Sequence, residues 1–434
     1  MHCAVLCSLA AVVSVQVSVS ALHVLEGGPE DPRAEAAEAF DATRRRVEAF
    51  SFRDFVAKFG RSYAEGTDQW AEREAAFAKR KEEVLAFLRG PPQSFTMGIT
   101  QFADYSAAEY QAVLGYRGRP RSSAGAGGSS AALARERGAF EHPQNYSVVR
   151  ENREMSRVVR NQGGCGSCWA AAATSVLESH IEANASVMKG LRRILDYSNR
   201  LSQLPTLSLQ TMVSCTKNPR NCGGQGGCSG ATVELAYEMV KEYGGIPLAL
   251  DWAYESGTGN TPDCRESVFQ EAVIGITGYE VLPSNKLHPL MQALFHTGGA
   301  IAVSVDATHW GMYDGGIFSD STWGGDFTVN HAVTLMAYKR PMRDESGELQ
   351  MGYWLIKNSW GADWGESGYI RLEMKENEEH HCGMDRETHK GLACDGDPDE
   401  ARVCGTCGIL YDSVYPTDVK LLKPVPAYKG YFPN

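Results

Sequence analysis

A cysteine suited to nucleophilic chemistry stands at 168, in the stretch 162–169, Gln-Gly-Gly-Cys-Gly-Ser-Cys-Trp. The segment 170–184 that follows is rich in alanine, which favours a helix. Four apolar residues recur there at helical spacing: Trp169, Ala173, Leu177 and Ile181. Because the free N–H groups at the start of a helix favour a thiolate over a thiol, Cys168 is a candidate nucleophile for acyl transfer.

The spacing of Cys165 and Cys168 has other interpretations. It also fits a thioredoxin-like redox pair, half of a zinc site, or two ordinary disulfide partners. Acyl transfer is favoured because Gln162 lies six positions before Cys168, a tryptophan follows directly, and a histidine and an asparagine occur downstream in suitable settings.

A nucleophilic thiolate needs a base, and the base needs a group that orients it. His331 lies within the apolar, strand-like stretch 329–338. Burying a polar ring there costs free energy, so its presence indicates a specific role. Asn358 follows the strand-like stretch 353–357, and its amide oxygen could fix the tautomer of an imidazole. Each also has an ordinary interpretation, His331 as a hydrogen-bonded core residue and Asn358 as a turn residue.

Taken together, these stretches resemble the papain-like cysteine proteases. The resemblance rests on 162–169, on Asn-His-Ala-Val at 330–333, and on Asn-Ser-Trp-Gly at 358–361. It implies that Cys168 is the nucleophile, His331 the acid and base, and Asn358 the orienting residue. It further implies an oxyanion hole made by Gln162 with the backbone N–H of Cys168. Trp360 would then shield the bond between His331 and Asn358 from water.

The elements that must position these residues change character along the chain. Helical spacing dominates to about residue 260, and from residue 272 the apolar period approaches two. The strand-like stretches are 300–305, 329–338, 353–357 and 368–372. We therefore expect an α+β, papain-like fold of two subdomains. A helical half, about 146–260, carries the nucleophile helix and packs against an antiparallel β-barrel half, about 265–434, with the substrate cleft between them. Residues 185–205 look like an inserted helix or loop with no assigned role.

Residues 66–90 form the clearest predicted helix, with Thr67 as its N-cap and Gly-Pro-Pro at its end. Its apolar face carries Trp70, Phe77, Val84 and Leu88. A helix with such a face needs a partner surface. The resemblance supplies one, because several residues match papain-family propeptides: Arg73, Phe77, Val84, Gly98, Phe102 and Asp104. Three positions depart from the propeptide pattern: Gln69, Arg80 and Leu88. Residues 51–115 are accordingly expected to be the core of an inhibitory prosegment.

The ends of the prosegment follow from composition. Residues 1–21 indicate a signal peptide, with an uncleaved membrane anchor as the alternative. The stretch 118–138 is rich in Gly, Ser, Ala and Arg and is typical of an exposed linker. We expect a propeptide at 22–138 and a mature catalytic domain at 139–434. Glycosylation sequons begin at Asn145 and Asn184.

Twelve cysteines in a secretory chain predict disulfides. The resemblance implies pairs Cys165–Cys228 and Cys215–Cys264. The third disulfide of the family has no matching pair of cysteines in this sequence, so Cys222 is expected to be unpaired. The remaining tail cysteines are expected to form two local disulfides: Cys382, Cys394, Cys404 and Cys407. A zinc site made by Cys404 and Cys407 with His380 or His381 is the alternative.

The resemblance also locates the substrate pocket. Gly230 and Ala231 would line the cleft, Ala231 replacing a usual glycine, and Trp360 would lie beside the catalytic pair. The floor of the pocket for the substrate residue two positions before the cut falls on Asp412, with Glu387 as the alternative. A carboxylate there would admit Arg or Lys as well as apolar side chains.

We therefore expect a cysteine endopeptidase made as a zymogen, secreted or in a lysosome-like acidic compartment. Its expected partners are protein or peptide substrates and its own prosegment; it is expected to be a monomer, with no cofactor and no metal. The net charge of −11 argues against binding to nucleic acid or an anionic membrane. Two rival functions are a catalytically silent binding protein of the same fold and a transglutaminase-like acyl transferase.

Overall fold

The computed structural model describes residues 32–116, 141–150, 153–197, 204–322 and 325–423. The predicted signal peptide, the predicted linker and residue 139, the expected start of the mature domain, lie outside these ranges. In the described ranges, no helix has both the length and the apolar content required to cross a membrane.

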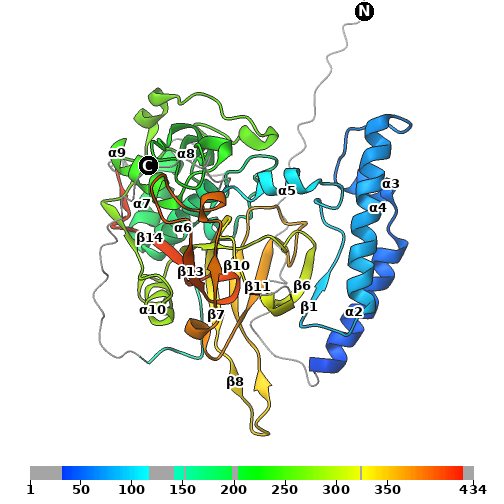
Figure 1. Cartoon of the computed structure of the whole chain (residues 1–434). Helices are drawn as coiled ribbons and strands as arrows, with labels where there is room; N and C mark the ends of the chain where they lie inside the picture. The colour runs from blue at the N-terminus through cyan, green and yellow to red at the C-terminus, as the bar shows by residue number, and fades with distance from the viewer. Residues whose placement is uncertain (1–31, 117–140, 151–152, 198–203, 323–324, 424–434) are drawn as a thin grey trace, which may run out of the picture.

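The amino-terminal helices form an arm beside one edge of the central sheet (Figure 1). They are α2 (Pro32–Ala49), α3 (Phe52–Lys58), α4 (Asp68–Arg89) and α5 (Ala107–Val113). α4 is the helix predicted at 66–90, and its prediction is confirmed at both ends. The Thr67 side chain accepts a hydrogen bond from the N–H of Trp70, and Gly90 follows the last residue of the helix.

α2 was not predicted from the sequence. Its residues are mostly charged or alanine, so its buried stripe is reduced to Phe40, Thr43 and Val47. The helix packs along α4, where the rings of Phe40 and Phe87 lie 5.6 Å apart between centroids. The helical arm therefore begins well before residue 51, the expected start of the prosegment core.

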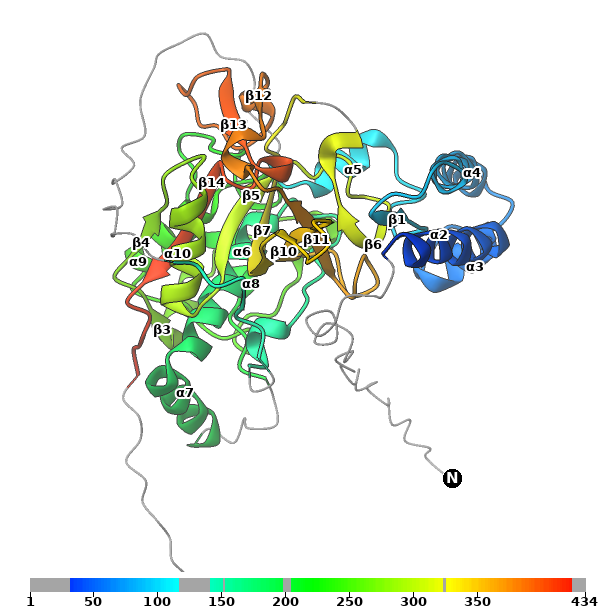
Figure 2. The ribbon, with the colours of Figure 1, turned by 90° about the horizontal axis from the view of Figure 1, so that it is seen from below.

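The helices that follow along the described chain lie away from the amino-terminal arm (Figure 2). They are α6 (Cys168–Ala183), α7 (Ala185–Tyr197), α8 (Leu209–Cys215), α9 (Val233–Glu242) and α10 (Leu287–Thr297). α6 is buried along its whole length from Cys168 to Ile181, not only on the predicted stripe, because β7, α8 and α9 all contact it. The insertion at 185–205 contributes α7.

Among the described residues, nine strands build the main sheet. Their order is β1-β6-β11-β10-β7-β5-β14-β4, and β2 also pairs with β7. Their bounds are β1 (Phe95–Met97), β2 (Asn145–Ser147), β4 (Gly278–Val281), β5 (Ile301–Val305), β6 (Tyr313–Phe318), β7 (His331–Lys339), β10 (Gly352–Lys357), β11 (Tyr369–Met374) and β14 (Asp412–Thr417). Neighbours are antiparallel except β6 and β11, as expected for the β half.

The part of the chain that the structure describes also contains three small two-stranded sheets. They pair β3 (Ile274–Gly275) with β15 (Lys420–Leu421), β8 (Met342–Arg343) with β9 (Leu349–Gln350), and β12 (Cys382–Asp385) with β13 (Ala401–Cys404).

The predicted propeptide, residues 22–138 and called the prosegment below, contributes a strand of its own to the main sheet. β1 pairs antiparallel with β6, matching Phe95 with Gly316 and Thr96 with Gly315. The chain then runs through α5 toward the amino end of α6 (Figure 1). This path carries residues 113–116 to the place where the candidate nucleophile lies.

Candidate active site

Cys168 is the first residue of α6, as the alanine-rich segment predicts, and its side chain is fully buried. The sulfur accepts a hydrogen bond from the backbone N–H of Ala332 at 3.3 Å. It donates one to the carbonyl oxygen of Leu114, also at 3.3 Å. The thiol therefore lies between the first residues of β7 and the end of the prosegment.

His331 begins β7, and Asn358 directly follows β10, the antiparallel neighbour of β7. This pairing brings the two side chains together, with His331 Nε2 2.8 Å from Asn358 Oδ1. The Trp360 ring lies over the imidazole, with centroids 4.9 Å apart and planes 30° apart. Sheet register thus joins two residues that lie 27 positions apart in the chain.

One carbonyl oxygen of the prosegment contacts both reactive groups. The oxygen of Leu114 lies 3.3 Å from Cys168 Sγ and 3.1 Å from His331 Nδ1. The next residue, Gly115, has a φ of +80°, and a Cβ there would lie 2.2 Å from the sulfur. Only a glycine lets the prosegment backbone approach the thiol so closely.

Burial under the prosegment keeps both groups uncharged. It raises the pKa of the Cys168 thiol to about 12, against the smaller effect of N–H donors at the sulfur. It lowers the pKa of His331 to about 4, although the hydrogen bonds to Asn358 and Leu114 act in the opposite direction. At neutral pH this chain therefore holds a thiol and a neutral imidazole, not an ion pair.

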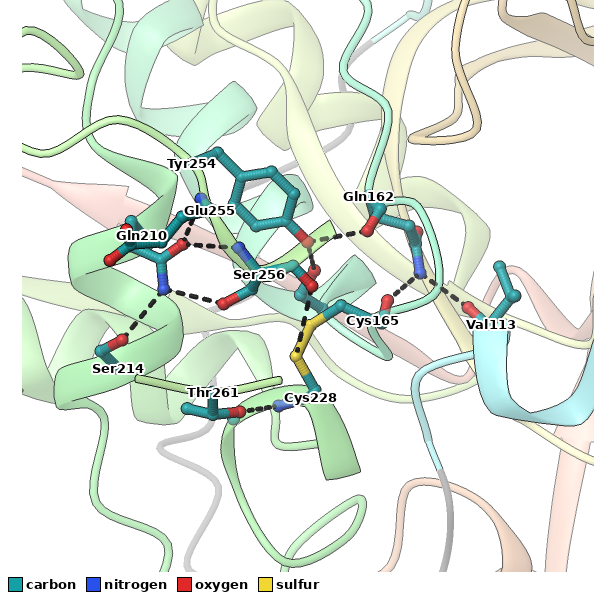
Figure 3. The surroundings of a disulfide bond; sticks show 12 residues. Val113, Gln162, Cys165, Gln210, Ser214, Cys228, Tyr254, Glu255, Ser256 and Thr261 are labelled. Carbon is teal, nitrogen blue, oxygen red and sulfur yellow. Dashed lines mark hydrogen bonds between the residues drawn. A yellow bond between two sulfur atoms is a disulfide. The ribbon is translucent and has the colours of Figure 1, made fainter. Parts of the chain in front are cut away.

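The Gln162 side chain lies at the same end of α6 and is also fully buried. Its Nε2 donates to the carbonyl oxygens of Val113 at 2.7 Å and Cys165 at 2.8 Å, as Figure 3 shows. Its Oε1 accepts a hydrogen bond from Ser359 Oγ at 2.6 Å. The amide donor thus points at the prosegment carbonyl that precedes Leu114.

The loop before α6 is held by a disulfide between Cys165 and Cys228 (Figure 3). The Tyr254 hydroxyl joins this loop to the helical half, donating to the Gln162 carbonyl oxygen at 2.8 Å. A second disulfide joins Cys215 to Cys264. These two pairs are the ones that the resemblance implies.

Of the two local disulfides predicted for the tail cysteines, one is present, and the prediction of the other was wrong. Cys382 and Cys404 form one local bond, which closes the β12–β13 hairpin. Cys394 instead bonds to Cys222, across 172 positions of sequence, and Cys407 remains a buried thiol. Sequence spacing could not reveal this because the tail folds back against the 218–224 loop, where Asn221 Nδ2 donates to Asp395.

The alternative zinc site also disagrees with these contacts. Cys404 is in a disulfide and His381 faces the Asp320 carboxylate. Among the described residues, no group of His, Cys, Asp and Glu side chains is arranged to hold a metal ion.

The predicted pocket residues lie around the prosegment residue Tyr116. A Cβ on Gly230 would lie 2.2 Å from the carbonyl oxygen of Gly115, so the prosegment backbone passes directly over this glycine. Tyr116 is buried, and its hydroxyl lies 3.0 Å from Ser304 Oγ. Ser304 in turn donates to Asp412 Oδ2 at 2.5 Å. Asp412 therefore lies at the inner end of the space that Tyr116 fills.

Two further findings concern the pocket floor. Glu387, the alternative floor residue, is at the surface and pairs with Lys390. Glu234, which sequence reasoning missed, interacts with the Asp412 carboxyl group and, together with burial, raises its pKa. Its one signal in the sequence is its place three residues after Ala231, in a stretch already assigned to the cleft.

Aromatic side chains of the prosegment cover the outer side of the site. Phe102 meets Trp360 edge-on, with centroids 4.9 Å apart, and Tyr110 lies 5.9 Å from the same ring. Gln101 donates to the Trp360 carbonyl oxygen at 2.5 Å. Within the prosegment, Asp104 accepts from Arg61 at 2.8 Å and from Tyr63 at 2.7 Å. Of the residues that match the propeptide pattern, Phe102 contacts the site directly, whereas Asp104 and Phe77 hold the prosegment itself together.

Comparison with known proteins decides the family. Residues 143–392 match the model of the papain family cysteine proteases, and residues 52–110 match the cathepsin propeptide inhibitor domain, I29. The chain belongs to the papain family. It is a cysteine endopeptidase made as a zymogen, and its propeptide inhibitor domain acts on its own protease.

Individual relatives agree with this family. The chain is 31% identical to cathepsin L of Sarcophaga peregrina over 305 residues, 67% of this chain and 76% of that protein. It is 30% identical to the oryzain beta chain of Oryza sativa subsp. japonica over 284 residues, 65% of this chain; the matched part spans about half of that relative, 52%.

Solved structures of precursors share the fold. The recombinant stem bromelain precursor is 27% identical, with a TM-score of 0.57, covering 84% of this chain and 97% of that one. Digestive procathepsin L2 from Tenebrio molitor larval midgut is 24% identical with a TM-score of 0.60, covering 84% and 98%. The papain-like α+β fold with a helical propeptide is therefore confirmed.

Proposed function

We propose that Cys168 is the nucleophile of this papain-family protease and His331 its acid and base, with Asn358 orienting the imidazole. The observation that carries the assignment is the Leu114 carbonyl oxygen, which contacts Cys168 Sγ at 3.3 Å and His331 Nδ1 at 3.1 Å. A substrate carbonyl entering the same place would meet both groups at once.

In the proposed reaction the prosegment has left and water reaches the pair. The thiol proton passes to His331, and the sulfur attacks the carbonyl carbon of the scissile peptide bond. The C–N bond breaks as His331 donates its proton to the leaving amine, which leaves a thioester on Cys168. A water molecule then gives a proton to His331 and attacks the thioester. The C–S bond breaks as His331 returns its proton to the sulfur, so the carboxylic acid product leaves and the thiol is restored.

Gln162 and the backbone N–H of Cys168 are the proposed oxyanion hole. The contact that supports this is the Gln162 Nε2 donor, which is 2.7 Å from the Val113 carbonyl oxygen in the zymogen. The same donor would be free for a substrate oxyanion once the prosegment leaves. Trp360, whose ring lies 4.9 Å from that of His331, would keep water from the bond to Asn358.

The prosegment is proposed to end in a linker at 118–138, with the mature domain at 139–434. Its residues 113–116 fill the cleft by contacts at Gln162, Cys168, His331 and Ser304. Protein or peptide substrates would enter this cleft only after it leaves. The proposed mature enzyme is a monomer that needs no cofactor.

For specificity, we propose that Asp412 forms the floor of the pocket for the substrate residue two positions before the cut. Gly230 and Ala231 would form its wall. The support comes from Tyr116, whose hydroxyl reaches Ser304 next to Asp412. An aromatic ring with a polar tip fits this space, so a long basic side chain would also fit, with its charge at the carboxylate.

Disulfides indicate the secretory pathway, since such bonds persist in oxidising compartments. Exposed sequon residues Asn145 and Asn184 agree with that route. Within it, we propose an acidic lysosome-like compartment or the extracellular space as the place of action.

Labelling of the thiol tests the nucleophile assignment. A thiol-reactive epoxide should modify Cys168 at least about tenfold faster after acid-induced loss of the prosegment than before, because Leu114 and Gly115 now cover the sulfur. Mass spectrometry of the digested protein locates the label. Cys407, the other buried thiol, is the internal control and should stay unlabelled. Label on Cys407 alone would contradict the assignment.

Acid should weaken the prosegment through Glu109. Its hydrogen bonds with Arg73 lower its pKa from 4.5 to about 2. A carboxylate whose pKa is lowered by folding stabilises the folded chain fully at pH values above its pKa in the unfolded chain, about 4.5. This stabilisation is lost as the pH falls toward 2, the pKa in the folded chain. Glu109→Gln removes this contribution at neutral pH. The pH at which Cys168 becomes open to labelling should therefore rise by about half a unit, a modest effect because the pair is partly exposed.

The matched control is Glu83→Gln, which removes an exposed pair with Arg80 inside one helix. Its release profile should match the unmodified chain. A profile that Glu109→Gln leaves unchanged would exclude this pair from acid release.

A further inference from the structure

Lys357, the last residue of β10, has a buried side chain that the proposed reaction does not use, and only 2% of the residue is exposed. Its ammonium group donates to the carbonyl oxygens of Ser156 at 2.6 Å and Val158 at 3.3 Å. A buried charge is unfavourable unless polar groups replace the water that it has lost, and the two carbonyl oxygens do so here. Lys357 directly precedes Asn358. Its hydrogen bonds therefore join the end of β10 to the segment 155–162.

Two carboxylates of α6 contact the same segment. Glu182 accepts hydrogen bonds from the N–H groups of Met155 at 2.7 Å and Ser156 at 3.0 Å. Glu178 forms an ion pair with Arg160, in which the Glu178 carboxylate is fully buried and Arg160 Nη1 lies 2.9 Å from Glu178 Oε2. The segment 155–162 is therefore fixed by side chains of α6, which carries the proposed nucleophile, and of β10.

The side chain of Lys357 is charged in acidic solution. Burial lowers its pKa to about 7, and Arg160 acts in the same direction, whereas the Glu178 and Glu182 carboxylates act in the opposite one. Below pH 7 the group is an ammonium ion, and a charged donor bonds a carbonyl oxygen more strongly than a neutral one does. In an acidic compartment, Lys357 therefore holds the segment 155–162 with charged donors.

Beyond these anchors, the segment 155–162 runs beside residues 359–361 as far as Gln162. The N–H of Gly361 donates to the Arg160 carbonyl oxygen at 2.9 Å, and the N–H of Gln162 donates to the Ser359 carbonyl oxygen at 2.9 Å. Ser359 Oγ also donates to Gln162 Oε1 at 2.6 Å. The Gln162 amide therefore takes its position from the contact between these two segments.

We propose that Lys357 is a positioning residue that fixes the oxyanion donor Gln162 relative to the pair of His331 and Asn358. This inference rests on the proposed function of Gln162 and extends it to a residue outside the reacting groups. Without the ammonium group, the two buried carbonyl oxygens would lack their donor, so we expect the segment 155–162 to shift. A displaced amide stabilises a developing oxyanion less, while binding of the intact peptide changes little.

The test is a double-mutant cycle on the processed enzyme, with kcat and KM measured on one fluorogenic peptide. Lys357→Met keeps the apolar part of the side chain but removes its donors. It should lower kcat about tenfold and change KM by less than about twofold. Gln162→Ala should lower kcat about a hundredfold, because it removes the oxyanion donor itself. Adding Lys357→Met to Gln162→Ala should lower kcat no further, because Lys357 acts through Gln162.

Lys339→Met is the matched control, since Lys339 ends the neighbouring strand β7 and is only partly buried. Its kcat should equal that of the unmodified enzyme. Lys357→Arg keeps a charge and several donors, so it should recover most of the lost kcat. If Lys357→Met does not fold, Glu182→Gln replaces it, because this change weakens the hold of α6 on Met155. Its smaller loss of kcat should also vanish in the Gln162→Ala background.

The outcomes distinguish the two proposals. If Gln162→Ala leaves kcat unchanged, the proposed oxyanion hole fails and this inference fails with it. If Gln162→Ala lowers kcat but Lys357→Met lowers it by the same factor in both backgrounds, the proposed function stands and the positioning role is overturned. An equal loss of kcat in Lys339→Met, or a change in KM alone in Lys357→Met, overturns the positioning role as well.

Discussion

Replacing Cys168 with serine should lower kcat/KM for peptide cleavage by at least about a thousandfold, the scale typical of losing a nucleophile. A serine hydroxyl has a much higher pKa than a cysteine thiol. We therefore expect that His331 cannot convert it to an effective nucleophile at this position. His331→Ala should cost nearly as much, and the double variant little more, because nucleophile and base act as one unit. The measurement is hydrolysis of a fluorogenic peptide by processed protein.

The same variants discriminate the protease from a silent binding protein. The chain should still fold and be secreted, because Cys168→Ser removes no hydrogen bond of the sheet. Cys407→Ser is the matched control, a buried thiol outside the site. Cleavage by Cys168→Ser at more than about a thousandth of the unmodified rate would mean that another residue is the nucleophile.

Removal of the prosegment should raise activity at least about a hundredfold, since a docking free energy of only ~3 kcal/mol leaves under one chain in a hundred open. The site is now closed by the Leu114 carbonyl on both reactive groups and by Tyr116 in the pocket. A recognition site for a foreign protease, inserted between Gly128 and Ser129, allows the same protein to be assayed before and after cutting and acid release.

A glycine pair supplies the matched control. Gly115→Ala should raise the activity of the uncut chain about tenfold, because its Cβ would overlap the Cys168 sulfur at 2.2 Å. Gly66 in the same prosegment has a similar φ of +84°, but its Cβ would meet nothing within 4 Å. Gly66→Ala carries comparable backbone strain and should leave the uncut chain inactive. Equal activity of cut and uncut protein would remove the inhibitory role.

Much of the fold could be predicted from the sequence because local signals were strong. Thr67 and Gly90 bound α4, and alanine-rich residues after Cys168 predicted α6. The strand-like stretches were each matched by a strand within a few residues. α2 was missed because its buried stripe is too sparse to stand out among charged residues.

What the sequence could not supply depends on contacts between distant segments. The Cys222–Cys394 disulfide needs the tail to return to a loop 172 positions earlier. Likewise, Glu234 influences the Asp412 carboxyl group only because α9 packs beside β14. The family resemblance named Asp412 as the floor residue of the pocket, and that role stays a prediction.

The pairing of β1 with β6 has a consequence for the mature protein. When the prosegment leaves, β6 becomes an edge strand, and the peptide groups of Gly315 and Gly316 lose their partners in β1. Exposed edge strands tend to pair with strands from other molecules. β6 carries its own protection, since two adjacent glycines weaken strand pairing and Asp314, released from Arg46, presents a bare negative charge. Activation therefore turns β6 from an internal strand into an edge strand whose sequence disfavours aggregation.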